Sequence, residues 1–295
     1  MKHNLKITAV LLAMFIVTQF IGLYVVNYYS AEDKQLPYGM ETPKIQEEKD
    51  FITLFPSIII AFIIAISLII LLSKFNMNFI IKLWFFIVVI IALGISFNSF
   101  LPGLKYSALI AVIIALPLAI EKIYRRNFII HNSTELFIYP GIAAVFVSIL
   151  NIWTIIILLI LISIYDVWAV WHSGIMQKMA KYHINKLHIF PGFFVPYISK
   201  KMRMKLKKLP KSELKNKKIQ AHVAILGGGD VIFPIITSGV VLRFWGLIPA
   251  LLVIAGATLG LSYLFFFAEK KKFYPAMPFI SAGIFLGMLI GWFLI

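Results

Sequence analysis

The chain has 295 residues, of which 61% are hydrophobic and only 14% are charged, and its mean hydropathy is +0.94. Soluble domains contain about 45–50% apolar and about 25% charged residues, so this composition excludes an ordinary globular domain. The chain contains no cysteine, which excludes a disulfide framework, thiolate catalysis and cysteine-ligated metal centres. The composition predicts a helical protein that crosses a membrane many times.

Nine apolar runs are each long enough to cross a bilayer as a helix, which takes about 17–25 residues. The run 135–172 is nearly continuous, but one helix of 38 residues would be about 57 Å long, so we divide it near Asn151. The first run is longer than the apolar segment of a signal peptide, so we expect it to stay as an anchor. The nine predicted helices span about residues 5–28, 51–73, 79–98, 104–120, 135–150, 152–172, 221–242, 246–268 and 274–295.

These spans predict an all-α, multi-pass protein of the cell membrane, organised in two parts. Residues 1–151 would form an N-terminal bundle of five helices. Residues 152–295 would contain the other four helices and a basic loop at about 173–220.

The charged residues are distributed unevenly. Of the 28 Lys and Arg residues, 13 lie between Lys178 and Lys218, and six of the 12 acids lie between Glu32 and Asp50. Nine spans place 23 basic residues on one side of the membrane and five on the other. By the positive-inside rule, the N-terminus is cytoplasmic and the C-terminus external. The net charge of +16 therefore predicts contact of the basic loop with anionic lipid, and no nucleic-acid motif is present.

Two acids lie inside predicted spans, Asp166 and Asp230. An ionisable residue at such depth costs about 2.5–3.5 kcal/mol on insertion scales, so it is a candidate functional residue. The alternative is a buried group that joins helices by hydrogen bonds. Asp166 would lie about 9 Å from the end of its span at His172, and Asp230 about 15 Å from Gln220. Antiparallel neighbouring helices would place both carboxyls at one level.

No basic residue lies deep in any predicted span, so each carboxyl is expected to have the other as its partner. Two carboxyls in a low-dielectric site cannot easily both ionise, so they would share a proton. One carboxylate could then take a proton from water while the protonated partner polarises a carbonyl. Such a dyad needs neither a metal nor an organic cofactor.

Two unusual segments accompany these acids. Glycine costs about 1 kcal/mol relative to alanine inside a helix, so three glycines before Asp230 indicate close helix packing or a loosened backbone that admits water and peptide. A proline pair at the last span is an ordinary helix start or an irregular segment that exposes backbone groups. The two segments are Gly227-Gly228-Gly229 and Pro275-Ala276-Met277-Pro278.

In these motifs the chain resembles the presenilin and signal peptide peptidase family of intramembrane aspartyl proteases. The matching motifs are Tyr165-Asp166, Gly227-Gly228-Gly229-Asp230, and Pro275-Ala276-Met277 followed by Pro278, where the family has Pro-Ala-Leu. The resemblance covers the chain from about Asn151 to its end and implies that Asp166 and Asp230 are catalytic. It also implies that transmembrane helices are the substrates. The loop between the two catalytic helices is cytoplasmic in presenilins and inverted in signal peptide peptidases, so the 13 basic residues of this loop imply the presenilin orientation. The substrate contacts that it implies are Tyr165, Gly227, Gly228, Gly229, Pro275, Ala276, Met277 and Pro278.

Other functions fit the motifs less well. The chain has no H-E-x-x-H for a zinc protease and no G-x-S-G for a rhomboid. A prepilin or preflagellin peptidase also uses Gly-x-Gly-Asp, but it lacks the Tyr-Asp and Pro-Ala-Leu-like motifs. A proton- or cation-coupled transporter would also place acids in the membrane, although no inverted repeat is visible here. The Ile-, Lys- and Asn-rich composition suggests a microbial, archaeal source.

Overall fold

The computed structural model describes residues 5–31, 34–40, 48–125, 127–173, 191–197, 222–268 and 274–295. Most of the predicted basic loop lies outside these residues, as do Lys270 to Lys272. The described residues form nine α-helices, one π-helical turn and two strands. In chain order these are α1 (Leu5–Ser30), α2 (Glu48–Lys74), α3 (Asn78–Ser99), α4 (Ser107–Tyr124), α5 (Phe128–Val147), α6 (Ile152–Trp168), η1 (Ala169–Ser173), β1 (Gly192–Tyr197), β2 (His222–Gly227), α10 (Gly228–Trp245), α11 (Leu247–Phe267) and α12 (Met277–Trp292).

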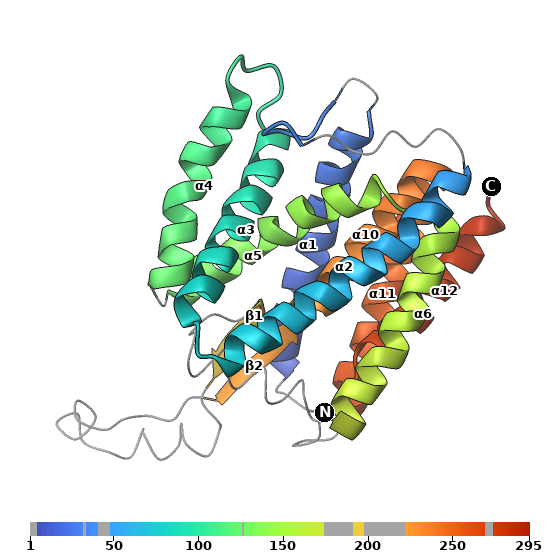
Figure 1. The fold of residues 1–295 in the computed structure, drawn as a ribbon. Coiled ribbons are helices and arrows are strands. Elements are labelled where there is room, and N and C mark those ends of the chain that lie inside the picture. Colours follow the sequence, from blue (N-terminus) through green and yellow to red (C-terminus); the bar gives the residue numbers. More distant parts are fainter. Residues whose placement is uncertain are drawn as a thin grey trace.

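The helices form one bundle (Figure 1). Helices α1, α5 and α10 pack against one another in its centre, with α3 and α4 on one side and α6, α11 and α12 on the other. The antiparallel pair β1–β2 lies at the end of the bundle where α1 begins. Its buried residues belong to the same apolar core as α1, α5, α6 and α10–α12, whereas α3 and α4 share a second, smaller core with α5.

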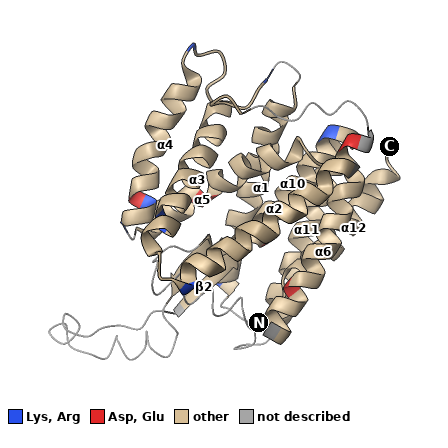
Figure 2. Cartoon of the chain, in the orientation of Figure 1, with Lys and Arg blue, Asp and Glu red and all other residues tan. Residues whose placement is uncertain are grey.

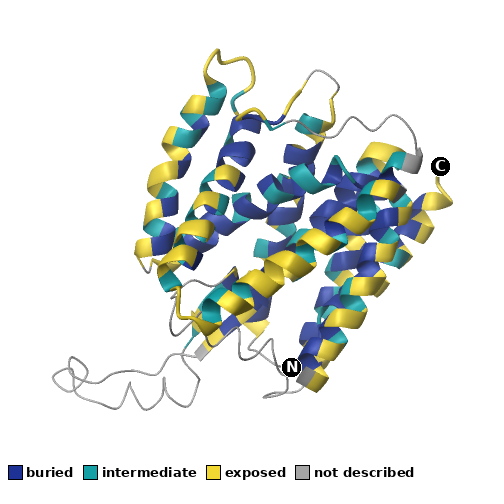
Figure 3. Ribbon diagram, in the orientation of Figure 1, coloured by how far each residue is buried: buried dark blue, intermediate teal, exposed yellow. Residues whose placement is uncertain are grey.

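The apolar composition of the helices matches a membrane environment. Seven helical segments of the described chain are long and apolar enough to cross a bilayer, and α12 is a shorter apolar helix. Helix α5 is also long enough, but the polar residues 131–135 lie in its first half. Charged residues are few on the helices (Figure 2). Burial differs sharply between helices: 6% of an apolar 18-residue stretch is buried in α2, against 50% in α10 (Figure 3).

The predicted division of the long apolar run is confirmed at Asn151, which begins α6. Its side-chain oxygen accepts the N–H of Thr154, and the Thr154 hydroxyl accepts the N–H of Asn151, so a capping box starts the new helix. The preceding boundary was wrong. Helix α5 begins at Phe128 rather than at residue 135, because Asn127 caps it by accepting the N–H of Ile129.

The span predicted at 221–242 is also wrong at its start, although the fold is helical as predicted apart from one short strand pair. Residues His222–Gly227 form strand β2, paired antiparallel with β1, and helix α10 begins only at Gly228. This segment is apolar enough to resemble the start of a membrane span, but alternate burial along it follows the period of a strand: Ala224 and Leu226 are buried, whereas Val223 and Ile225 are exposed. Helix α12 likewise begins at Met277 rather than at residue 274.

Helices α11 and α12 approach each other so closely that glycine is required at their contact. A Cβ atom on Gly256 would lie 2.0 Å from the carbonyl oxygen of Gly283, and one on Gly283 would lie 2.1 Å from that of Gly256. Small residues allow such backbone approach between membrane helices. This contact fixes α12, whose first turn contributes to the site described below.

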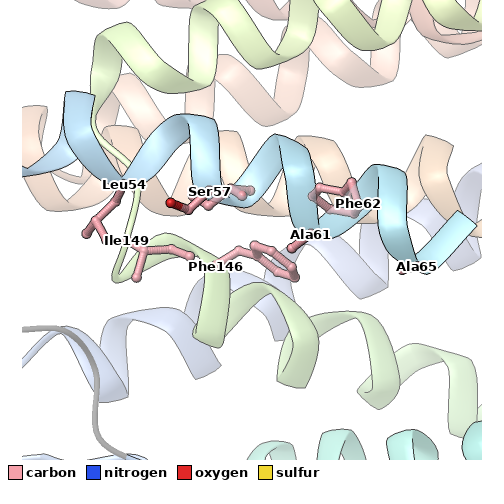
Figure 4. Close-up of a pocket in the computed structure, with 8 residues that line it drawn as sticks. Leu54, Ser57, Ala61, Phe62, Ala65, Phe146 and Ile149 are labelled. Atoms are coloured by element: carbon pink, nitrogen blue, oxygen red, sulfur yellow. The ribbon is translucent and has the colours of Figure 1, made fainter.

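A groove of about 420 Å³ opens between α2 and α5 (Figure 4). Its walls are apolar except for Ser57, so it offers no group for acid–base chemistry. None of the residues predicted for the site lines it. The lining residues are Leu54, Ser57, Ile58, Ala61, Phe62, Ala65, Phe146 and Ile149.

Candidate active site

Asp166 is buried on α6 and contacts the first residue of α12. Its Oδ2 accepts the backbone N–H of Met277 at 3.0 Å, and the residue is 7% exposed. The first N–H groups of a helix have no partner within the helix and carry the positive end of its dipole, so a carboxylate is favoured there. Nearby, the Ser163 hydroxyl donates to that of Ser281 at 3.0 Å and joins the same two helices. Asp166 therefore acts as an interhelical cap for α12.

The helix that carries Asp166 continues as the π-helical turn η1 at Ala169–Ser173. Such turns are rare and often occur at functional sites. Tyr165 lies on a different face from Asp166 and is half exposed beside Trp168, with ring centroids 6.3 Å apart. The predicted contact of Tyr165 with substrate stays a prediction.

Asp230 is the third residue of α10 and lies in its first turn. The expected depth of about 15 Å in a helix was wrong, because the residues before Gly228 form a strand. Gly227 is the extended N-cap residue, and a Cβ atom there would lie 3.2 Å from Asp230 Oδ2. An acid in the first turn is favoured by the helix dipole. Asp230 thus lies at a strand–helix junction.

The three glycines have different surroundings. Gly228 is buried, and a Cβ atom there would lie 2.9 Å from the hydroxyl oxygen of Tyr139 on α5. Gly229 is exposed, and the nearest atom to an added Cβ is a ring carbon of Phe233 at 3.8 Å. Gly228 is therefore required for packing, whereas Gly229 has room for a methyl group.

Three mutually packed helices carry the predicted site residues. Helix α6 packs on α10 and α12, and α10 packs on α12. The structure brings Asp166 into direct contact with Met277 of the proline-containing segment. It brings Asp230, in the first turn of the neighbouring helix α10, close to Gly227, which ends β2 and caps that helix. Each carboxyl was expected to have the other as its partner. The structure gives Asp166 a further partner that was not predicted, the backbone N–H of Met277.

A buried polar cluster on α4 and α5 was missed from the sequence. Lys122 Nζ donates to Glu135 Oε1 at 2.7 Å, and the two side chains are 5% and 2% exposed. Lys122 follows the predicted span 104–120 and Glu135 begins the predicted span 135–150, so neither residue lies inside an apolar run. The signal was the spacing of His131, Glu135 and Tyr139, which at four-residue intervals share one face of a helix.

Metal ligation is a separate question. Within the part of the chain that the structure describes, no three His, Asp or Glu side chains are grouped as a metal site requires. The chemistry considered below uses only the two carboxyls and water.

The fold and the placement of Asp166 and Asp230 define a class of protein: a multi-pass helical membrane protein with one buried and one partly buried carboxyl on packed helices. The profile of the family described as signal-peptide peptidase, presenilin aspartyl protease matches residues 12–295. The chain belongs to this family. It is therefore an intramembrane aspartyl protease, a hydrolase.

Two solved structures have a similar fold. Both are described as a presenilin family intramembrane aspartate protease, one in space group C222 and one in space group P2. The first has a TM-score of 0.65 and 19% identity, and the match covers 98% of this chain and 99% of that one. The second has a TM-score of 0.61 and 18% identity, with 97% of each chain covered. No curated protein sequence matches the chain.

Proposed function

We propose that Asp166 and Asp230 are the catalytic pair with which this protease hydrolyses peptide bonds in transmembrane segments of other proteins. The observation that carries this proposal is the placement of Asp166: it is buried and hydrogen-bonded to the start of α12, on a helix that packs against α10, where Asp230 lies in the first turn. One carboxylate takes a proton from water, and the protonated carboxyl polarises the scissile carbonyl. The family match favours this mechanism over a prepilin-type peptidase or a transporter.

Strand β2 supplies a place for an unwound substrate. A helix hides its carbonyls in hydrogen bonds, so the substrate must become extended before attack. Ile225 faces Phe194 across the β1–β2 pair, and Phe194 directs its backbone groups away from β2. In an antiparallel pair, Ile225 then directs its own backbone groups away from β1. An extended substrate can add to this edge next to Asp230. Tyr165, Gly229 and the segment 275–278 would contact its side chains.

The orientation proposed from the charges places the N-terminus in the cytoplasm and the C-terminus outside the cell membrane. The basic loop would then be cytoplasmic and bind anionic lipid, with each Lys or Arg contributing about 1 kcal/mol near the surface. A reporter tag inserted near Lys211 should be cytoplasmic, and one after Ile295 external. An external tag near Lys211 would reverse the orientation.

The decisive experiment is cleavage of a single-span reporter by the purified protein in detergent, with the products sequenced. Cleavage within or at the edge of the span is expected. The rate should depend on pH as a bell-shaped curve, because one carboxyl must be protonated and the other ionised. A rate that is flat from about pH 4 to pH 9 would contradict a dyad.

A further inference from the structure

Strand β1 is held along the edge opposite β2 by polar side chains of α5. Asn132 Nδ2 donates to the carbonyl oxygen of Phe194 at 2.9 Å, and the Phe194 N–H donates to Asn132 Oδ1 at 3.1 Å. One side-chain amide thereby satisfies both backbone groups of one strand residue. Asn132 takes the place that a residue of a third strand would have.

The same edge is held at Gly192. Its carbonyl oxygen lies 2.9 Å from His131 Nε2, and its N–H donates to Glu135 Oε1 at 3.5 Å. A carbonyl oxygen only accepts, so Nε2 carries a proton and Nδ1 of the neutral ring can accept from Lys122 Nζ at 3.3 Å. Lys122 therefore holds both side chains that contact Gly192.

These contacts leave the other edge of β1 for β2. Alternate residues of an antiparallel strand direct their backbone groups to opposite edges. The backbone N–H and C=O groups of Gly192 and Phe194 point to α5, so those of Phe193 and Val195 point to β2. Pro196 falls on the α5 edge, where its missing N–H removes no hydrogen bond between the two strands.

The register of this pair determines where Asp230 lies. Gly192 is opposite Gly227, which is the N-cap residue of α10, and Gly228 donates its N–H to the Pro191 carbonyl at 3.2 Å. Asp230 follows two residues later. A shift of one residue in a strand pair moves every side chain to the opposite face. The hydrogen bonds that hold β1 therefore also determine the position of Asp230.

Alternate burial along β2 opposes a slip of one residue, but the hydrophobic effect is non-directional and does not by itself fix how β1 lies against α5. Helix α5 also packs against β1 and α10, where the Tyr139 ring lies 5.8 Å from that of Phe193 and limits the space at Gly228. Hydrogen bonds to Gly192 and Phe194 add the direction that apolar contacts lack. A buried ion pair such as Lys122–Glu135 contributes little net stability, so its orienting effect is the better explanation of its presence.

We propose that the polar face of α5, with Asn132 at its centre, is a positioning element that holds Asp230 in register through β1 and β2. The inference rests on the proposed catalytic role of Asp230. It assigns Asn132, His131 and Glu135 as positioning residues, which act on the carboxyl only through the strand pair.

The test compares Asn132→Leu with Asn98→Leu, using the full-length protein and a single-span reporter in detergent. Leucine has the branched shape of asparagine but no amide. Asn98 is the matched control, because it is also buried but donates to the Tyr29 hydroxyl, away from the strands. In Asn132→Leu, kcat per folded molecule should fall by about 100-fold with KM within about twofold, as expected of a misplaced catalytic group. Asn98→Leu should keep its kcat.

A disulfide between β1 and β2 can be formed and reduced again, and its effect on kcat separates positioning of Asp230 from general stability. The chain has no cysteine, so the double substitution Pro196→Cys/Val223→Cys creates the only possible disulfide. These residues are opposite each other at a close pair, with Cα atoms about 4.5 Å apart. In the Asn132→Leu background, the oxidised disulfide should restore most of the lost kcat, measured against the same cysteine pair in the protein that keeps Asn132. Reduction of the disulfide should remove this gain. If Asn132→Leu does not accumulate, Asn132→Ser, which is too short to reach both groups of Phe194, takes its place.

Three results would overturn the proposal: an unchanged kcat in the Asn132 variants, a rise in KM alone, or a lower melting temperature with full kcat per folded molecule. The proposed function fails separately. It fails if the wild type does not cleave the reporter or if Asp230→Asn still cleaves it, whatever the Asn132 variants do.

Discussion

The two acids of this protease are held in place in different ways. Asp166 is in the interior of a helix that continues beyond it, and a backbone N–H of α12 binds its carboxyl directly. Asp230 lies in the first turn of a helix, directly after a strand, and its position depends on the pairing of β1 with β2. One acid is fixed by helix packing and the other by strand register.

This difference separates the side chains on which each acid depends. Asp166 depends on α12, which close glycine contacts hold against α11. Asp230 depends on α5, which belongs to the N-terminal half of the chain but contacts β1, α10 and Gly228. Helix α5 therefore supports the proposed site, and substitutions on it should affect one acid more than the other.

The largest effects are expected from the acids themselves. Asp166→Asn and Asp230→Asn should each lower cleavage by at least about 100-fold, because the amide has the shape of the acid but cannot transfer the proton. The melting temperature should stay close to that of the wild type. Cleavage of the reporter by each variant, at equal amounts of folded protein, measures the effect. Substantial activity in either variant would show that the two residues are not a catalytic pair.

The next effect concerns stability. Lys122→Met leaves Glu135 buried without its cation and should lower the free energy of unfolding by about 3–5 kcal/mol. Arg125→Met is the control, at the C-cap of the same helix: Arg125 pairs with Glu121, but its side chain is 75% exposed, so the expected cost is below about 1 kcal/mol. Unfolding in mixed micelles with increasing SDS measures both.

The double variant Lys122→Met/Glu135→Gln completes this comparison. It removes both charges and should recover part of the stability that Lys122→Met loses. Equal unfolding curves for Lys122→Met and Arg125→Met would contradict the burial of this pair.

A smaller effect on activity is expected at the strand–helix junction. In Gly228→Ala the added methyl group meets Tyr139 and displaces the start of α10, so cleavage should fall by roughly tenfold. Gly229→Ala has room in the structure. Its melting temperature should therefore equal that of the wild type, and any loss of cleavage there would report contact with substrate. Equal thermal stability and cleavage in Gly228→Ala would mean that Tyr139 does not limit this junction.

The smallest effect is expected at Met277, although it contacts Asp166. The contact comes from its backbone N–H, which any residue except proline supplies. Met277→Leu preserves volume at this buried position, so stability should change by less than about 1.5 kcal/mol and cleavage by less than about threefold. Kinetics with the reporter measure this. A large loss would assign the Met277 side chain, rather than the backbone, to the reaction.

The sequence predicted the helical membrane fold and the division at Asn151, because long apolar runs and a capping residue are local signals. It also identified the candidate acids, since a carboxyl in an apolar run is conspicuous. It did not predict strand β2, because a short apolar strand before an apolar helix resembles one continuous span. The start of α5 was missed because the polar residues 131–135 interrupt its apolar pattern, although its cap at Asn127 was readable.

The sequence alone determined which residues could do chemistry in this protein, because an ionisable group stands out wherever the surrounding residues are apolar. Only the tertiary structure decided what those residues contact. The N–H that binds Asp166 is 111 positions away in the chain, and the amide that holds β1 is 62 positions from the residue it pairs with. Backbone groups are identical at every position, so no residue pattern marks which N–H or carbonyl will be used. That choice is made by the packing of α5, α6 and α12 around the strand pair.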